Sequence, residues 1–381
     1  MRGPRTGGVR VDRAVLAVNP PFGWAPDGAD PYWPAQDPAA PVLVLRALGL
    51  GDGLTAVPSL RGLRRLLPGR LIVLAMAHPV ARLLHGAGVV DRVLPARGLG
   101  EAPPGLALGR HLAVNLHGRG PQSHRTLLAG SPQALLAFDC PQAGVPGPPW
   151  RDPRLDGEHE IARWCRLVEW AGGRCDPTDL RLPRPVVVRP RGLPAGEVAG
   201  GETGFPPTRD VVVLHPGAAS GSRRWPAERW VRVAAALAAR GMRVVVTGSA
   251  GEQPLCAQVV AGARLPAGAD LAGRISLDRL AALVASAGLL ICGDTGVAHL
   301  ATAYRTRSVL LFGPTSPAAW GPTIDPHLHV TVWHGDAEYP GDPHAATPDP
   351  ALLRITEHEV LRAVDAVQST PTQRFVPRRA G

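Results

Sequence analysis

Two glycine-rich stretches decide the fold: LHPGAAS at residues 214–220 and GDTGVAH at residues 293–299. Each follows a short apolar run, VVVL at 211–214 and LLIC at 289–292, and each leads into a segment with helical spacing. A strand, a glycine turn and a helix in that order are typical of an open α/β sheet, in which ligands gather at the carboxyl ends of the strands. Glycine lets the backbone approach a ligand, and helix N-termini offer N–H groups to anions. Two such turns in one domain predict a site for a phosphorylated ligand.

Apolar runs and helical segments alternate twice along the chain, which predicts α/β domains with parallel sheets covered on both faces. In the first half we expect strands 42–46, 71–77, 112–116 and 134–138 and helices 54–67, 79–85 and 158–171. In the second half we expect strands 211–214, 243–247, 289–292 and 308–312 and helices 227–240, 277–287, 297–303 and 352–367.

A chain of 381 residues is expected to form two domains. A stretch dense in Pro and Gly between the two alternating halves is the predicted linker. The expected divisions are a partly ordered leader (1–40), an N-terminal Rossmann-like domain (41–182), the linker (183–207), a C-terminal Rossmann-like domain (208–350), a C-terminal helix (351–369) and a disordered tail (370–381).

The net charge of +10 comes entirely from arginine, because the chain contains no lysine. No basic run alternates with aromatic residues as a stacking surface for bases requires, so we do not expect nucleic acid as a partner. An anionic membrane surface does suit so basic a chain. The five scattered cysteines form no C-x-x-C pair, which argues against a zinc or redox motif. With no membrane-length apolar run and no signal peptide, we expect a cytoplasmic protein, with peripheral association at the inner face of the plasma membrane.

The turn GLGDG at residues 49–53 lies between the first strong strand and its helix. Glycines on both sides let the loop fold tightly and present the Asp52 carboxylate to a cleft, where it could act as a general base. The alternative is a solvated aspartate favoured by the dipole of the following helix. Spacing alone leaves both interpretations open.

Four residues just ahead of a predicted helix could bind a diphosphate through charge-assisted hydrogen bonds: Ser220, Ser222, Arg223 and Arg224. The alternative is an ordinary solvated arginine pair beside a buried Trp225. A second phosphate-binding set follows the strand 289–292. It consists of Thr295, Gly296, Val297 and His299, which follow Asp294 on the same loop and helix start; a core histidine is the alternative for His299.

Glu252 follows the strand 243–247 and the turn at Gly248, where acidic residues bind ribose hydroxyls in nucleotide-binding folds. An exposed glutamate at a helix start is the alternative. Gly248, Glu252 and Asp294 are the predicted nucleotide-binding residues. Gly51, His117 and Arg125 are the candidates for the acceptor side of the cleft, and His124 has the same predicted position.

With these residues in view, the chain resembles glycosyltransferase family nine, the lipopolysaccharide heptosyltransferase family, from about residue 42 to residue 320. Four motifs in the family's order carry the resemblance. They are VLVLRALGLGDGLTAVPSLRGLRRLLP from residue 42, LHPGAASGSRRWPAERW from 214, LLICGDTGVAHLA from 289 and LLFGPTSPAAWGP from 310.

The resemblance implies a GT-B fold, in which two Rossmann-like βαβ domains face a central cleft, with the acceptor on the N-terminal and the donor on the C-terminal domain. It implies metal-independent, inverting transfer of a heptose-like sugar, without a cofactor, from a nucleotide-diphosphate donor to a cell-envelope glycan or glycolipid. Asp52 would then be the base, and Arg223 stands where the family has a lysine facing the donor phosphates. Thr295, Gly296 and His299 match the family's phosphate loop, and Glu252 matches a ribose contact.

Other functions remain open on the sequence. A non-catalytic sugar-nucleotide binder and a sugar-nucleotide epimerase could both use this architecture. A nicotinamide-dependent Rossmann enzyme is disfavoured, because no strand leads into G-x-G-x-x-G with an acidic residue about twenty positions on.

Overall fold

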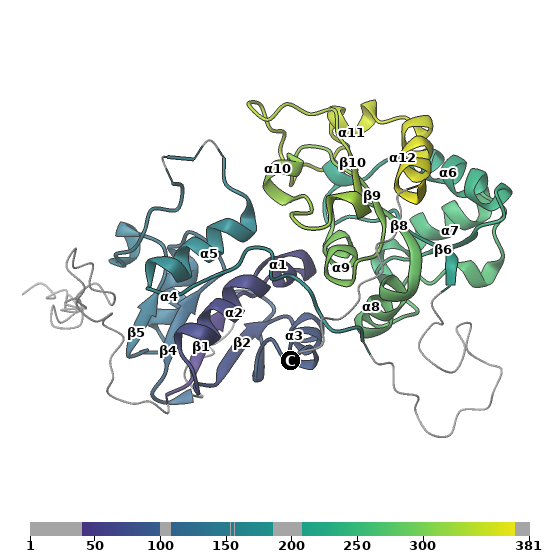
Figure 1. The fold of residues 1–381 in the computed structure, drawn as a ribbon. Helices are drawn as coiled ribbons and strands as arrows, with labels where there is room; N and C mark the ends of the chain where they lie inside the picture. Colours follow the sequence, from purple (N-terminus) through teal and green to yellow (C-terminus); the bar gives the residue numbers. More distant parts are fainter. Residues whose placement is uncertain (1–39, 100–107, 153, 156, 186–207, 370–381) are drawn as a thin grey trace, which may run out of the picture.

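The computed structural model describes residues 40–99, 108–152, 154–155, 157–185 and 208–369. These residues form two α/β units (Figure 1), the first in purple to teal and the second in green to yellow. The predicted leader up to residue 39, residues 186–207 of the predicted linker and the predicted tail from residue 370 lie outside the described residues.

The N-terminal unit is built on a five-stranded parallel sheet. Its strands are β1 (Val42–Leu45), β2 (Ile72–Met76), β3 (Arg92–Pro95), β4 (Leu112–Asn115) and β5 (Ala134–Leu136). Its helices are α1 (Leu50–Thr55), α2 (Val57–Leu66), α3 (His78–Gly86), α4 (Gln122–Leu128) and α5 (Glu160–Trp170), with a 3₁₀ turn η3 (Pro141–Ala143). The sheet order is β3-β2-β1-β4-β5. β1, β2 and β4 are buried along their whole length, as apolar strands covered on both faces should be.

The C-terminal unit repeats this plan with the sheet order β10-β9-β8-β6-β7. Its strands are β6 (Thr208–His215), β7 (Arg243–Val246), β8 (Ala287–Gly293), β9 (Ser308–Leu311) and β10 (His329–Val332). Its α-helices are α6 (Ala227–Ala239), α7 (Gln253–Gly262), α8 (Leu277–Ser286), α9 (Gly296–Tyr304), α10 (Pro317–Trp320), α11 (Pro350–Arg354) and α12 (Glu357–Ser369). Four 3₁₀ turns complete it: η4 (Gly221–Arg223), η5 (Ala250–Glu252), η6 (Ala267–Ala269) and η7 (Pro326–Leu328).

Both sheets confirm the predicted parallel α/β class, and two expected helices are each divided in two. The predicted helix 54–67 is interrupted at Ala56 because Pro58, in the first turn of α2, has no N–H with which to continue α1. The predicted helix 352–367 breaks at Ile355, whose backbone is extended between α11 and α12. α1 also begins at Leu50, which places Asp52 in the first turn of a helix rather than in a loop.

The two units contact each other directly at the ends of α1 and α9 (Figure 1). The approach is so close that a Cβ atom on Gly296 would lie 2.7 Å from the backbone nitrogen of Gly51. The His159 Nε2–H group donates a hydrogen bond of 2.9 Å to the carbonyl oxygen of Gly321, which also joins the units. Among the described residues, no helix has both the length and the apolar character needed to span a bilayer.

Candidate active site

A cavity of about 580 Å³ lies between the two units. In each sheet, the strand order reverses beside the first strand of the unit: between β1 and β4, and between β6 and β8. Loops diverge at such a point, which leaves a crevice at the carboxyl ends of the strands. The loops after β1, β6 and β8 line the cavity, and they are the loops singled out in the sequence.

The structure brings nine predicted site residues together around this cavity. They are Gly51, Asp52, Arg223, Glu252, Asp294, Thr295, Gly296, Val297 and His299. Asp52 comes from the N-terminal unit and Arg223 from the C-terminal unit, more than 170 positions later in the sequence. The cavity therefore depends on both units.

Asp52 closes the first turn of α1 through its own side chain. Its Oδ2 atom accepts a hydrogen bond of 3.3 Å from the backbone N–H of Gly49. Its Oδ1 atom lies 3.3 Å from Nη2 of Arg46, and its side chain keeps 29% of its surface exposed. A carboxylate is favoured at a helix N-terminus, which fixes the direction of this side chain toward the cavity.

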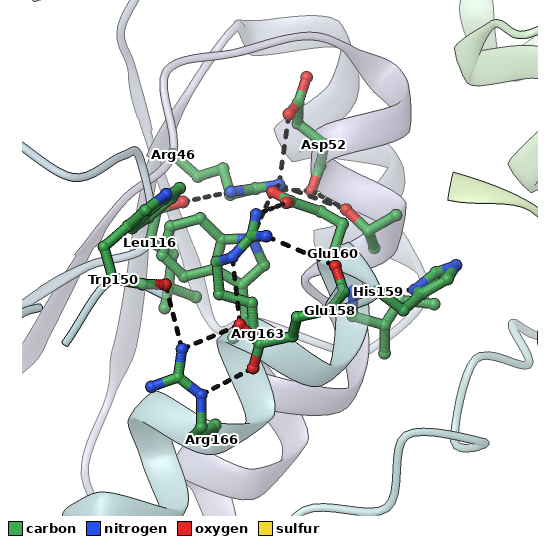
Figure 2. A network of polar contacts seen from close by, with 12 residues as sticks. Arg46, Asp52, Leu116, Trp150, Glu158, His159, Glu160, Arg163 and Arg166 are labelled. Carbon is green, nitrogen blue, oxygen red and sulfur yellow. Dashed lines mark hydrogen bonds and ion pairs between the residues drawn. The ribbon is translucent and has the colours of Figure 1, made fainter. Parts of the chain in front are cut away.

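Behind Asp52 lies a buried polar network centred on Arg46 (Figure 2). The guanidinium of Arg46 is fully buried and also lies 3.2 Å from Glu160 Oε1. It stacks 4.6 Å from the ring centroid of Trp164, whose Nε1–H donates to Glu160 at 2.7 Å. Arg163 pairs with the other oxygen of Glu160 at 2.6 Å. The network thus places a cation and a second carboxylate immediately behind Asp52.

These neighbours act on the pKa of Asp52 in opposite directions. Burial raises the pKa above its ordinary value, the Arg46 charge lowers it, and the Glu160 charge raises it again. The net effect is a raised pKa. A carboxylate with a raised pKa that still faces an open cavity is suited to accept a proton.

The opposite wall carries the charge for an anionic ligand. Arg223 Nε donates to Ser220 Oγ at 3.2 Å, and its Nη1 donates to the backbone oxygen of Asp294 at 3.3 Å. Both bonds hold the guanidinium between the loops after β6 and β8. Thr295 is the N-cap residue of α9, and its side chain makes no capping hydrogen bond. The N–H groups of this helix start and Arg223 form a surface that suits phosphate.

Two histidines at the cavity are kept neutral by burial. Burial, with a smaller contribution from the charge of His159, lowers the pKa of His299 to about 4. Burial also lowers the pKa of His215, against the opposing charge of Glu252. The His215 Nδ1–H donates at 3.0 Å to Thr247 Oγ1, which itself donates to the backbone oxygen of Leu214. Neutral imidazoles at this wall can hydrogen-bond to a ligand without adding charge.

Glu252 lines the cavity from η5 and α7, and its position relies on a glycine. Its Oε2 atom accepts hydrogen bonds from the backbone and side chain of Ser249 at 2.7 Å and 2.9 Å. A Cβ atom on Gly217 would lie only 2.0 Å from Glu252 Oε1. The glycine of the loop after β6 therefore makes room for the carboxylate.

Six other predicted site residues are not among the residues that line the cavity: Ser220, Ser222, Arg224, Gly248, His117 and Arg125. Arg224 Nε donates to Ala218 at 2.9 Å, and the exposed Arg125 donates to Gln142 at 2.8 Å, both to backbone oxygens. The neighbouring candidate His124 is fully buried and donates at 2.9 Å to the backbone oxygen of Phe138. Ser220 reaches the site indirectly, through its bond to Arg223. The roles proposed for the six residues remain predictions.

The sequence analysis did not predict some of the residues that line the cavity, nor the polar network behind Asp52. His215, Thr315, Trp320, Pro343 and His344 line the cavity without having been assigned to the site. The network of Arg46 and Glu160 was missed as well, since its partners are 114 positions apart. Arg46 directly follows an apolar run, which implies that its side chain is buried. A buried charge needs a partner, so this position was the signal in the sequence for the network.

Comparison with known proteins shows which proteins this chain resembles. Residues 151–338 match the model of "Glycosyltransferase family 9 (heptosyltransferase)". Lipopolysaccharide heptosyltransferase 3 of Escherichia coli is 30% identical over 167 residues, which are 43% of this chain and 48% of that protein. Over these residues the chain is similar to the family 9 heptosyltransferases. Its alignments span about half the length of the first curated relatives that it matches.

Solved structures show that the chain shares the GT-B fold across both of its units. A family 9 glycosyl transferase from Veillonella parvula DSM 2008 superposes with a TM-score of 0.67 at 18% identity, covering 86% of this chain and 97% of that one. The E. coli heptosyltransferase WaaC, solved with ADP, gives a TM-score of 0.59 at 17% identity, covering 86% and 100%. The family match begins beyond Asp52, so the position of this residue relative to the cavity comes from the fold.

Proposed function

We propose that this protein moves a sugar from a nucleoside diphosphate to a hydroxyl group of a cell-envelope glycan or glycolipid, with inversion and without a metal ion. The observation that carries the proposal is that Asp52 and Arg223, from different units, line one cavity. A base that accepts a proton and a cation that meets a departing diphosphate are the two groups that this transfer needs.

In this mechanism Asp52 takes the proton of the acceptor hydroxyl as its oxygen attacks the anomeric carbon of the donor. The raised pKa of Asp52 makes its carboxylate a stronger base, while Arg46 at 3.3 Å favours the ionised form. Arg223 and the N-terminus of α9 stabilise the negative charge that develops on the diphosphate. With the base on one wall and the leaving group on the other, the attack inverts the anomeric centre.

The proposed substrates follow from the relatives. Because the matching family is named for heptosyl transfer and one fold neighbour was solved with ADP, we propose a heptose-like sugar on a nucleoside diphosphate such as ADP. The curated relatives are lipopolysaccharide heptosyltransferases, which favours a glycan or glycolipid acceptor. The net charge of +10 suits an anionic surface, so we propose a cytoplasmic enzyme that associates peripherally with the inner face of the plasma membrane.

The test is release of nucleoside diphosphate from ADP-, UDP- and GDP-sugars in the presence of cell-envelope extract. We expect Asp52→Asn to reduce transfer by about 100-fold or more, the usual effect of losing a general base, with ADP affinity changed only a few-fold. Asp365→Asn is the matched control, because Asp365 is an exposed residue of α12 that pairs with Arg240. Equal turnover in Asp52→Asn and wild-type protein would eliminate Asp52 as the base.

Further measurements test whether transfer needs a metal ion, whether it inverts the anomeric centre, and whether an alternative function applies. Transfer should continue at the same rate after treatment with a chelator, and the anomeric configuration of the product should be opposite to that of the donor. Binding of a nucleotide sugar with no donor consumed would favour the non-catalytic binder. A changed donor sugar without transfer would favour the epimerase.

A further inference from the structure

One segment of the C-terminal unit reaches the cavity from a part of the chain that carries no recognised motif. Residues 341–349 follow β10 and precede α11, and we call them the strap. Pro343 and His344 of the strap line the same cavity as Arg223. The strap therefore forms part of the wall on the side that we assign to the donor.

Main-chain hydrogen bonds fix the strap against the loop after β6. The Ser222 N–H donates to the Ala345 oxygen at 2.9 Å, and the Asp349 N–H donates to the Ser222 oxygen at 3.2 Å. The Ser220 hydroxyl donates to the Pro343 oxygen. These three bonds attach the strap at both of its ends to the loop that carries Arg223.

The packing of the strap requires a glycine beneath it. A Cβ atom on Gly221 would lie 1.6 Å from the carbonyl oxygen of Ala346, which no side chain could tolerate without displacing the strap. Ser220 then connects the strap to the cationic group, because its Oγ atom accepts from Arg223 Nε at 3.2 Å while its hydroxyl proton goes to Pro343. Strap, serine and arginine thus form one structural unit.

The charges around the cavity leave a role for His344. Among the described residues that line it, Arg223 is the single permanent cation, and it faces three carboxylates: Asp52, Glu252 and Asp294. A diphosphate adds further negative charge to this set, so it needs additional hydrogen-bond donors. Of the three histidines that line the cavity, His215 is buried, His299 is half-buried and His344 is exposed, with its backbone N–H bound to Asp342 at 2.8 Å.

We propose that the strap belongs to the donor site and that His344 binds the diphosphate beside Arg223. This inference rests on the proposed function, because it assigns the wall around Arg223 to the donor. It makes His344 a residue that selects a diphosphate over a nucleoside, and it explains why the strap is fixed beside Arg223. The ligand chemistry is a nucleoside diphosphate, recognised through its phosphate oxygens.

The experiment is calorimetric titration of the full chain with ADP, UDP and GDP, each compared with its nucleoside. We expect His344→Ala to weaken the binding of the diphosphate by about 10-fold, as for a lost hydrogen bond to a charged group. Affinity for the nucleoside should stay unchanged. His344→Gln, which keeps a donor, should recover part of the loss, and the exposed His327→Ala on η7 is the matched control and should match wild type.

Gly221→Ala is a second, independent variant. It should displace the strap and weaken diphosphate binding at least as much as His344→Ala, with an unfolding temperature measured in parallel to check the fold. Equal affinity of wild type and His344→Ala overturns the role of the strap and leaves the proposed function standing. If His344→Ala loses affinity equally for the diphosphate and for the nucleoside, the proposed contact between His344 and the phosphates is overturned. Wild-type protein that binds none of the three diphosphates overturns the donor site itself.

Discussion

Asp52 and Glu160 share one nitrogen of a single buried guanidinium: Arg46 Nη2 lies 3.3 Å from Asp52 and 3.2 Å from Glu160. Glu160 is held by two further donors, Arg163 and Trp164 Nε1 (Figure 2). Asp52 has fewer partners and faces the cavity. The strength with which Arg46 holds Asp52 therefore depends on the charge of Glu160.

Replacing Glu160 by Gln should move the pH dependence of transfer toward acid. Glu160 raises the pKa of Asp52, so its neutralisation lowers that pKa. Asp52 acts as a base above its pKa, and the acid limb of kcat/KM should shift to lower pH. Glu158→Gln is the control, because Glu158 pairs with Arg163 and Arg166 instead. An acid limb that shifts to higher pH in Glu160→Gln, or that shifts equally in both variants, would refute the coupling between Glu160 and Asp52.

Replacing Arg46 by Leu should strongly destabilise the N-terminal unit. The change leaves Glu160 and Asp52 without their shared cation, and removing one partner of a buried pair costs about 3–5 kcal/mol. The free energy of unfolding is measured by urea denaturation followed by circular dichroism. Arg240→Leu removes an exposed pair with Asp365 and should cost at most about 1 kcal/mol. Similar losses in the two variants would contradict the structural role of Arg46.

Replacing Gly296 by Ala should separate the two units. The new Cβ would lie 2.7 Å from Gly51 N, so one backbone must move. Alanine is the better helix former, so a loss of activity would not reflect a weaker α9. We expect a larger radius of gyration in X-ray scattering and transfer reduced by about 100-fold, as displacements near 1 Å can cause. At Gly268 a Cβ meets no atom within 4 Å, so Gly268→Ala should change neither quantity.

His329 should make the protein less stable in acid. Burial lowers the pKa of this histidine to about 4, while its ordinary value is 6.5. Between these two values the unfolded chain binds a proton that the folded chain does not, so stability falls as the pH drops from about 6.5 toward about 4. His329→Gln should reduce the slope of this part of the profile, measured as urea midpoints at several pH values, while His299 and His215 keep their own contributions. The exposed His358→Gln on α12 should leave the profile unchanged.

Local patterns predicted eight of the ten strands in the described residues and the three cavity-lining loops, because apolar runs, glycine turns and helix starts are properties of neighbouring residues. The half-exposed edge strands β3 and β10 were missed, because neither is uniformly apolar. Three helices, α4, α7 and the short α10, were also missed. Pairings across long stretches of chain could not be predicted: Arg46 meets Glu160, and Ser220 meets Pro343, only after the sheets have assembled. Such contacts depend on topology rather than on local sequence.

The close approach of Gly51 to Gly296 also bears on how the two halves would move. The side chains of Leu50 and His299 flank this contact, so a small rotation would change their packing while the two main chains stay together, and the contact would serve as a fulcrum. A small swing about this fulcrum would widen the distant rim considerably, yet would scarcely separate the groups beside it. Substrates could then enter and leave while Asp52 and the start of α9 stay in alignment.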